Sequence, residues 1–201
     1  MASLLQAIGE IVRPELLQKG PIRLEELDPG STCKPITINK RGQAVVLKPD
    51  IRPEGLCGRP GCQFTFTAPD RLFPLFRLDV AGLAAVCDYI VFCQENVEGD
   101  DRVFVLLCEL KSNNVGGSRR QVENGRLLAE YVLKMAALHT RLSKVPRVEH
   151  RGLIFSPKFN VPKGSLQKTR CKYEPLPDGF PDLPFAYYAG GAEYPLAHFC
   201  V

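Results

Sequence analysis

Three charged residues near the middle of the chain have the types and spacing of a metal-dependent hydrolytic site. Asp88 lies in an apolar run (Cys87-Asp88-Tyr89-Ile90-Val91-Phe92), and Glu109-Leu110-Lys111 ends the next apolar run. Residues two apart on a strand share a face, so Glu109 and Lys111 should point the same way, with Asp88 on the adjoining strand. Two carboxylates that converge at a sheet edge form a hard oxygen site suited to Mg²⁺.

Such a site predicts phosphodiester chemistry. The backbone carbonyl of Leu110 lies between the two charged residues and is a further candidate metal ligand. Bound Mg²⁺, or Mn²⁺, would bridge the scissile phosphate and lower the pKa of a bound water. Lys111 would then orient or deprotonate that water and stabilise charge on the phosphoryl oxygens.

The two apolar runs predict a β-hairpin that positions these residues. Its strands are expected over Leu83–Phe92 and Arg102–Leu110, around an Asn-, Gly- and acid-rich turn at Glu95–Asp101. Both faces of the first strand are apolar, which is typical of the middle of a sheet covered by helices. The hairpin should therefore lie at the centre of the fold.

The remaining periodicities predict an α/β domain: a mixed central β-sheet flanked by helices. The chain is expected to form one domain over 1–201, with its core at about 75–155 and a proline-rich, basic C-terminal region at 156–201. The other expected elements are helices at 3–18 (bent by Pro14) and Ser118–Leu142, and strands at Ile36–Asn39, Gln43–Leu47 and His150–Phe155.

Composition restricts the class of protein and its surroundings. The chain has 201 residues, 45% of them hydrophobic, and a formal charge of +4, which is a globular balance that permits contact with a polyanion. Eight cysteines are present, but the N-terminus does not have the pattern of a signal peptide, and Cys87, Cys93 and Cys108 lie inside apolar runs. These features favour a reduced, cytoplasmic protein. No apolar run approaches the roughly 18 residues that span a bilayer, so no membrane association is expected.

The acid and the Glu-x-Lys triplet resemble the motifs of the PD-(D/E)xK nuclease superfamily. The resemblance covers about residues 83–155, with Asp88 as the acid of the first motif and Glu109-Leu110-Lys111 as the second. Cys87 stands where the motif's name has proline. The order of an acid strand, a Glu-x-Lys strand, a helix and a strand also agrees, and the resemblance implies a restriction-endonuclease-like fold.

The resemblance implies further site residues. In exonuclease-like members a glutamine early in the helix reaches the site, and Gln121 occupies such a place. Ser118 to Gln121 equally fits a helix capping box, and the sequence leaves both interpretations open. Many members also take a glutamate from the first helix, for which Glu10 and Glu15 are candidates and Glu10 is preferred.

Structural interpretations compete with the catalytic one. Asp88 could be satisfied by a neighbouring backbone group or lysine, and Glu109 with Lys111 could form a surface ion pair of little energetic value. Cys57 and Cys62 could bind zinc, but a single pair separated by four residues is more typical of a turn with incidental cysteines.

Basic residues suggest where a nucleic acid would lie. Arg119 and Arg120 follow a glycine-rich loop, and Lys158 and Lys163 begin a basic stretch with interleaved aromatic residues. The sequence thus predicts a Mg²⁺-dependent nuclease that acts on DNA in preference to RNA. The resemblance to the PD-(D/E)xK superfamily implies a place in a defence, mobile-element or repair system. The alternative is a non-catalytic interaction or assembly subunit that keeps the fold. A protein partner or a second copy of the chain is compatible with either.

Overall fold

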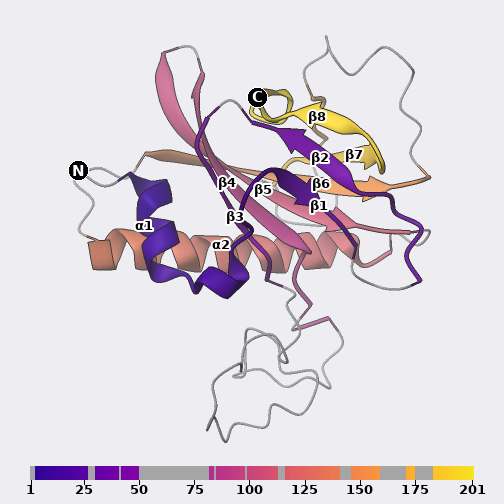
Figure 1. Ribbon diagram of the computed structural model, residues 1–201, viewed down its shortest axis with the longest axis horizontal. Helices are drawn as coiled ribbons and strands as arrows, with labels where there is room; N and C mark the ends of the chain where they lie inside the picture. The colour runs from indigo at the N-terminus through magenta and orange to yellow at the C-terminus, as the bar shows by residue number, and fades with distance from the viewer. Residues whose placement is uncertain are drawn as a thin grey trace, which may run out of the picture.

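The computed structural model describes residues 3–26, 30–40, 42–49, 82–83, 85–97, 99–112, 116–140, 146–158, 171–174 and 183–201. Its helices and strands, shown in Figure 1, are α1 (Leu4–Ile11), η1 (Pro14–Leu16), β1 (Ile22–Leu24), β2 (Ile36–Asn39), β3 (Ala44–Leu47), β4 (Tyr89–Val97), β5 (Asp100–Leu110), α2 (Ser118–Thr140), β6 (Arg147–Ser156), β7 (Phe185–Ala189), β8 (Glu193–Pro195) and η3 (Leu196–His198). Within these residues no helix is both long and apolar enough to cross a membrane.

The main sheet is mixed and has the strand order β3-β4-β5-β6-β7. β3, β4 and β5 are antiparallel neighbours, whereas β6 runs parallel to both β5 and β7. Parallel neighbours need a crossover connection, and α2 lies in the connection between β5 and β6. The expected α/β class with a mixed central sheet is therefore confirmed. β3 and β7 also belong to this sheet, although both lie outside the expected core at 75–155.

The helices cover one face of this sheet, so the expectation of a sheet flanked by helices holds on one side alone. α1 and α2 pack on the face that contains Ile90 and Phe92. A second sheet of order β1-β2-β8 covers the face that contains Tyr89 and Val91. β1 was not expected, because it is three residues long in a turn-rich segment. The parallel pairing of β2 with β8 joins distant parts of the chain, so local sequence patterns could not predict it.

The central hairpin is longer and has a tighter turn than the sequence suggests. Its ladder runs from Tyr89 paired with Cys108 to Val97 paired with Asp100, and Gly99 lies in the turn with φ 87°. The Asn96 side chain accepts a hydrogen bond from the Gly99 N–H. The polar residues predicted as a loop form the outer ends of both strands, which project beyond the core (Figure 1).

Other boundaries differ by a few residues. The first helix ends at Ile11, and Pro14 begins a separate 3-10 turn at Pro14–Leu16. β6 extends outward from the expected His150–Phe155 by three residues at its start and one at its end. The described part of α2 ends at Thr140, so the expected end at Leu142 lies outside the described residues.

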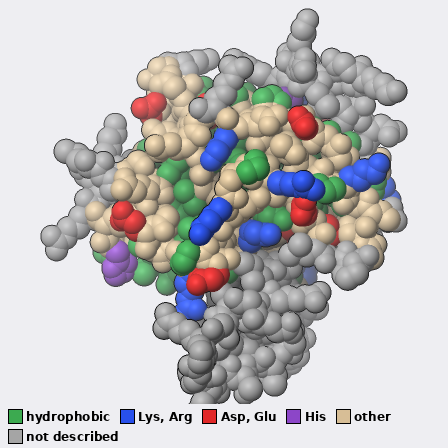
Figure 2. Space-filling model, in the orientation of Figure 1, with side chains coloured by type: hydrophobic (Ala, Val, Ile, Leu, Met, Phe, Trp, Pro, Cys, Tyr) green, Lys and Arg blue, Asp and Glu red, His purple; other side chains and the backbone are tan. Residues whose placement is uncertain are grey.

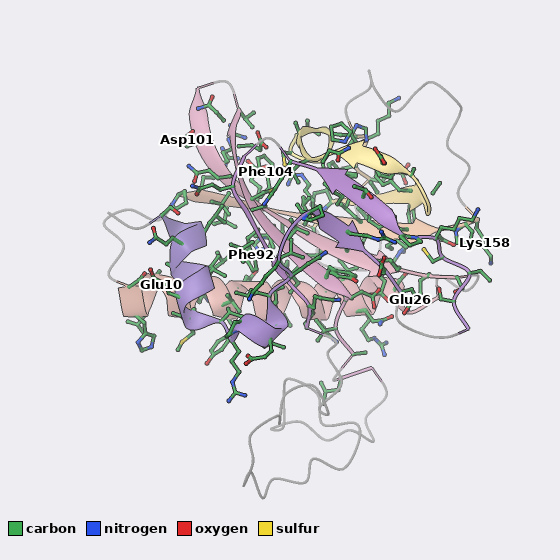
Figure 3. The ribbon with its side chains drawn as sticks, viewed as in Figure 1. Glu10, Glu26, Phe92, Asp101, Phe104 and Lys158 are labelled. Carbon is green, nitrogen blue, oxygen red and sulfur yellow. The ribbon has the colours of Figure 1, made fainter. Side chains whose placement is uncertain are left out.

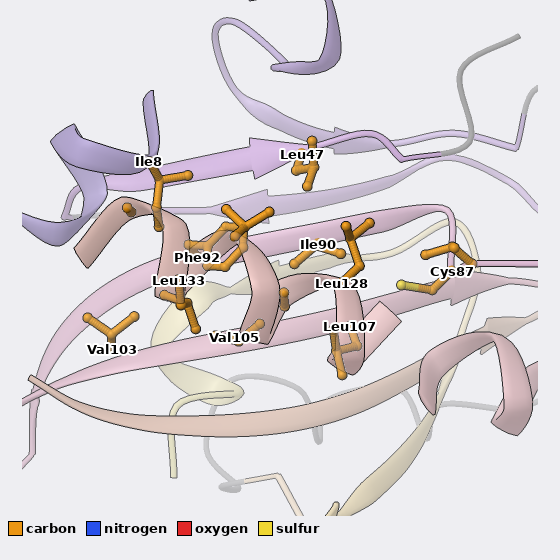
Figure 4. Packing of buried hydrophobic residues seen from close by; sticks show 14 of the residues in the cluster. Ile8, Leu47, Cys87, Ile90, Phe92, Val103, Val105, Leu107, Leu128 and Leu133 are labelled. Carbon is orange, nitrogen blue, oxygen red and sulfur yellow. The ribbon is translucent and has the colours of Figure 1, made fainter. Parts of the chain in front are cut away.

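The close approach of α2 to the main sheet depends on Gly125 and Cys87. A Cβ atom at Gly125 would lie 2.4 Å from the sulfur of Cys87, which is shorter than any real contact between such atoms. Cys87 is buried and lies among Ile90, Leu107 and Leu128 in the core beneath the helix (Figure 4). The Cys87 N–H also donates to the carbonyl of Gln121 in the first turn of α2. These contacts fix the helix against the chain segment that leads into β4.

Gly125→Ala is expected to lower the free energy of unfolding by roughly 1–3 kcal/mol, because the added methyl group overpacks this contact. The measurement is urea unfolding followed by circular dichroism. Gly9→Ala in α1 is the matched control, since a Cβ at Gly9 meets nothing within 4 Å and alanine favours a helix. Equal stability of Gly125→Ala and the wild type would contradict the close packing, and Cys87→Ala combined with Gly125→Ala should recover part of the loss.

Candidate active site

Asp88, Glu109 and Lys111 come together at the end of β5. Asp88 immediately precedes β4, and Tyr89 pairs with Cys108, so continuing this register brings Asp88 opposite Glu109. Ile90 and Leu107, two residues along each strand, face the helices, so Asp88 and Glu109 share that face. Lys111 follows the last residue of β5, and its backbone N–H donates to the carbonyl of Phe155 in β6 at 2.8 Å. The structure thus brings the three predicted residues together.

Glu109 is a buried carboxylate with an unusual environment. Its side chain is 0% exposed, and Oε1 lies 2.5 Å from Nζ of Lys111, whose side chain is 23% exposed. Oε2 makes no hydrogen bond of ordinary geometry among the described residues, and the backbone of Asp88 lies close enough to lower the pKa of this carboxyl group. Burial, as the largest cause, and the negative charge of Asp88 together raise the pKa of Glu109 to about 8, against the opposing effect of Lys111. This arrangement is therefore not the exposed surface pair that the sequence left open.

Asp88 is half-buried, and one of its carboxylate oxygens is held by the backbone. Oδ2 of Asp88 accepts a hydrogen bond of 2.7 Å from the N–H of Leu110. This is the hydrogen bond to a neighbouring backbone group that the structural interpretation of Asp88 predicted. It also fixes the carboxylate beside the Glu-x-Lys triplet. The side chain of Leu110 is buried on the opposite face of the sheet.

The first turn of α2 lies over this end of the sheet. Gly117, with φ 78°, precedes the helix, and its carbonyl accepts the first helical hydrogen bond from the Gln121 N–H. Gly117 therefore occupies the N-cap position, and Ser118 is the first helical residue and buried. The capping box considered for Ser118 and Gln121 is not formed in this register. Gln121 is half-buried.

Tyr187 belongs to the same end of the sheet and was not singled out from the sequence. It pairs with Ile154, which pairs with Glu109, so the three residues form one row across β5, β6 and β7. Its hydroxyl accepts hydrogen bonds from Nε and Nη2 of Arg119, at 3.3 and 3.2 Å. β7 was not predicted from the sequence, because its parallel pairing with β6 joins distant parts of the chain.

The other candidates are spread around this end or lie elsewhere. Arg120 packs its side chain beside Gly82, and Lys158 is exposed just beyond the end of β6. Figure 3 shows Lys158 on the same side of the molecule as Glu26 and on the opposite side from Glu10. Lys163 lies outside the described residues, as do Cys57 and Cys62 with the zinc site considered for them.

The structure does not bring the preferred first-helix glutamate to the site. Glu10 is exposed on α1 beside Ala44 and Val45, and Ala44 pairs with Cys93. Cys93 lies five residues beyond Asp88, which corresponds to roughly 16 Å along the strand. Glu15 is exposed in η1.

Glu26, in the loop after β1, is an acid near the site that was not predicted from the sequence. Burial, as the largest cause, and the negative charges of Glu26 and Asp88 together raise the pKa of Cys33 to about 11. Both acids therefore act electrostatically on the same thiol. The turn-rich sequence around Glu26 gave no indication that this residue lies near Cys33 and Asp88.

The donor set is compatible with a hard divalent cation. Among the described residues no group of three or more His, Cys, Asp and Glu side chains is placed to hold a metal ion. Mg²⁺, however, commonly takes one or two carboxylates and completes its shell with water and substrate phosphate. Asp88 and Glu109 supply two mutually repelling carboxylates, and Oε2 of Glu109 is a buried oxygen without a hydrogen bond of ordinary geometry among the described residues.

Comparisons with protein-family models, with curated proteins and with solved structures gave no match to this chain. Support for a function therefore comes from the side-chain geometry just described. Its central feature is a buried carboxylate between a second acid and a lysine, beneath the start of a helix.

The pKa of Glu109 predicts a pH-dependent stability. The pKa of this carboxyl group is about 8 in the folded protein and its ordinary 4.5 in the unfolded chain. Between pH 4.5 and pH 8 the folded protein therefore binds more protons than the unfolded chain. Stability is therefore lost as pH rises from about 4.5 to 8. Glu109→Gln removes this loss, so its stability relative to wild type should rise over this range by on the order of 4 kcal/mol. Chemical denaturation in chelator at several pH values measures the difference.

Glu10→Gln is the control for this measurement, because Glu10 is exposed and its substitution should leave the pH dependence unchanged. Stability curves for the wild type and Glu109→Gln that run parallel between pH 5 and 8 would contradict the raised pKa.

Proposed function

We propose that this chain is a metal-dependent nuclease that hydrolyses phosphodiester bonds, with DNA favoured over RNA. The proposal is carried by one observation: the buried Glu109 carboxylate lies beside Asp88 and within 2.5 Å of the Lys111 ammonium. A buried charge that is only partly compensated is unfavourable for folding, and such groups concentrate at functional sites.

The order of elements supports a restriction-endonuclease-like core. Asp88 leads into β4, the Glu-x-Lys triplet ends β5, and α2 and β6 follow. This is the order that the resemblance to the PD-(D/E)xK superfamily implies. The mixed sheet, with antiparallel β4 and β5 and parallel β5 and β6, is compatible with it.

Asp88 and Glu109, with the carbonyl of Leu110, would hold Mg²⁺ or Mn²⁺. When bound, the cation would polarise the scissile phosphate and make a bound water more acidic. The Lys111 ammonium would donate hydrogen bonds to the attacking water and to a phosphoryl oxygen. The water oxygen forms a bond to phosphorus and gives up a proton to solvent, while the bond to the leaving oxygen breaks and that oxygen takes up a proton from solvent. The products are a phosphomonoester and an alcohol.

Gln121 and the basic side chains would support the substrate. The Gln121 amide is half-buried at the start of α2, next to the segment that carries Asp88. Arg119, Arg120 and Lys158 are exposed around the same end of the sheet. On the face shown in Figure 2, basic side chains gather toward the middle and one side, with single acidic side chains between them.

The six described cysteines are free, buried thiols, which supports a reducing compartment such as the cytoplasm. A role in defence, in a mobile element or in repair would suit a small nuclease. It rests on the family resemblance alone.

One observation favours the alternative of a non-catalytic interaction or assembly subunit. Glu109 is fully buried, and Lys111 already neutralises one of its oxygens, as in an ion pair with a structural role. In that case the pair would take no part in metal binding. The two functions therefore differ in whether a divalent cation can engage Glu109.

The nuclease predicts metal-dependent cleavage that requires the acid–lysine set. Purified protein incubated with linear, circular and single-stranded DNA and RNA should cleave with Mg²⁺ or Mn²⁺ and not with chelator. Lys111→Ala and Glu109→Gln should each lower the rate at least 100-fold, in the range of single electrostatic contributions to catalysis. Gel electrophoresis of the products gives the rates.

Lys134→Ala, which removes an exposed charge from the middle of α2, is the control and should cleave as the wild type does. Full activity of Glu109→Gln, or cleavage in chelator, would refute the site.

Metal binding can be tested without cleavage. Mn²⁺ should raise the thermal midpoint of the wild type, because a ligand that binds the folded state alone stabilises it. Asp88→Asn and Glu109→Gln should remove the increase, and Glu10→Gln should keep it. An unchanged midpoint in the wild type at millimolar Mn²⁺ would favour the non-catalytic subunit.

A further inference from the structure

Arg119 differs from several other arginines of this protein in the chemical type of the partner that its guanidinium contacts. Arg102, Arg147 and Arg151 all lie within 4 Å of the Glu149 carboxylate. Arg119 has no carboxylate at such a distance among the described residues, and its partner is the neutral phenol of Tyr187. Within the part of the chain that the structure describes, the positive charge of Arg119 is therefore oriented without being neutralised by a carboxylate.

The guanidinium of Arg119 keeps most of its hydrogen-bonding capacity. Nε and Nη2 each donate one hydrogen to the Tyr187 hydroxyl, so three of the five guanidinium N–H groups remain for another acceptor. A planar guanidinium with adjacent donors matches the oxygens of a phosphate group. The exposed position of Arg119 leaves this approach open.

The position of the pair relates it to the acid–lysine set. Tyr187 and Glu109 occupy the same row of the sheet, two strands apart, which is roughly 10 Å. Arg119 and Gln121 lie about 200° apart around the first turn of α2. Arg119 donates hydrogen bonds to Tyr187 in β7, and the Gln121 carbonyl accepts one from Cys87, just before β4. A nucleic-acid strand with its scissile phosphate at Glu109 would bring a neighbouring phosphate toward Arg119.

We propose that Arg119, positioned by the Tyr187 hydroxyl, binds a phosphate group of the substrate strand next to the scissile phosphodiester. The strand then crosses the end of the sheet from β5 toward β7. This inference rests on the proposed nuclease function. The phosphate can be an internal diester or a terminal monoester, which have the same recognition chemistry.

The test is binding of a fluorescent single-stranded oligonucleotide in chelator, where no metal-dependent cleavage occurs, at several salt concentrations. Arg119→Met should weaken binding about 10-fold and reduce the slope of log K against log salt by about 0.7, since one phosphate contact is lost. Tyr187→Phe should weaken binding less and keep the slope, because it removes the positioning and keeps the charge. Circular dichroism melting verifies that both variants are folded.

Lys134→Met is the control for loss of one positive charge from α2. It lies fifteen residues after Arg119, or roughly 22 Å along the helix, and should change neither affinity nor slope. Equal effects of Lys134→Met and Arg119→Met, or no binding by the wild type at low salt, would overturn the proposal.

Two comparisons separate the remaining outcomes. An Arg119 effect on circular single-stranded DNA identifies an internal diester, whereas an effect confined to 5′- or 3′-phosphorylated linear strands identifies a terminal phosphate. With Mn²⁺ present, Arg119→Met should raise KM and leave kcat unchanged. Cleavage that does not depend on Arg119 would overturn this subsite and keep the nuclease. Arg119-dependent binding without any cleavage would overturn the nuclease and keep the subsite.

Discussion

The candidate site depends on how closely α2 approaches the main sheet. Gly125 has no side chain where it crosses Cys87, so the helix lies directly on the segment that leads into β4. The same contact lets the Cys87 N–H reach the carbonyl of Gln121. With the helix fixed in this way, its first turn covers the end of β5, where Glu109 lies. A larger residue at position 125 would clash with the Cys87 sulfur and force the helix and this segment apart.

The electrostatics of the site follow from this cover. A carboxylate at the end of a strand is ordinarily hydrated, but Glu109 is buried and is flanked by the charge of Asp88. Removal from water and like-charge repulsion both disfavour its ionised form, and a cation restores it. A proton and the Lys111 ammonium thus compete for the same oxygens, and in the proposed nuclease a divalent metal ion would compete with them. The lysine can compensate one oxygen, and it leaves the other without a hydrogen bond of ordinary geometry among the described residues.

Sequence reasoning reached the parts of this arrangement that are encoded locally. The spacing of Glu109 and Lys111 and the apolar runs around Asp88 were sufficient to predict strands that bring these residues together. The sequence did not reveal β1, the pairing of β2 with β8, or the row that joins Glu109 to Tyr187. Each of these depends on partners far apart in the chain, for which periodicity gives no information. The turn at Gly99 was predicted too wide because exposed strand ends have the composition of a loop.

The energetics bear on the choice between a catalytic and a structural role for the acid–lysine pair. Apolar residues of similar volume in place of a buried ion pair are often neutral or stabilising, so Glu109 and Lys111 are a poor means of stabilising a sheet. The local environment increases the disadvantage, since Asp88 repels Glu109 and only one of its oxygens meets the ammonium. A purely structural pair would be expected to satisfy both oxygens. Under the proposed nuclease function, the second oxygen would instead meet a metal cation, and Arg119, held by the neutral Tyr187 hydroxyl, would face the substrate.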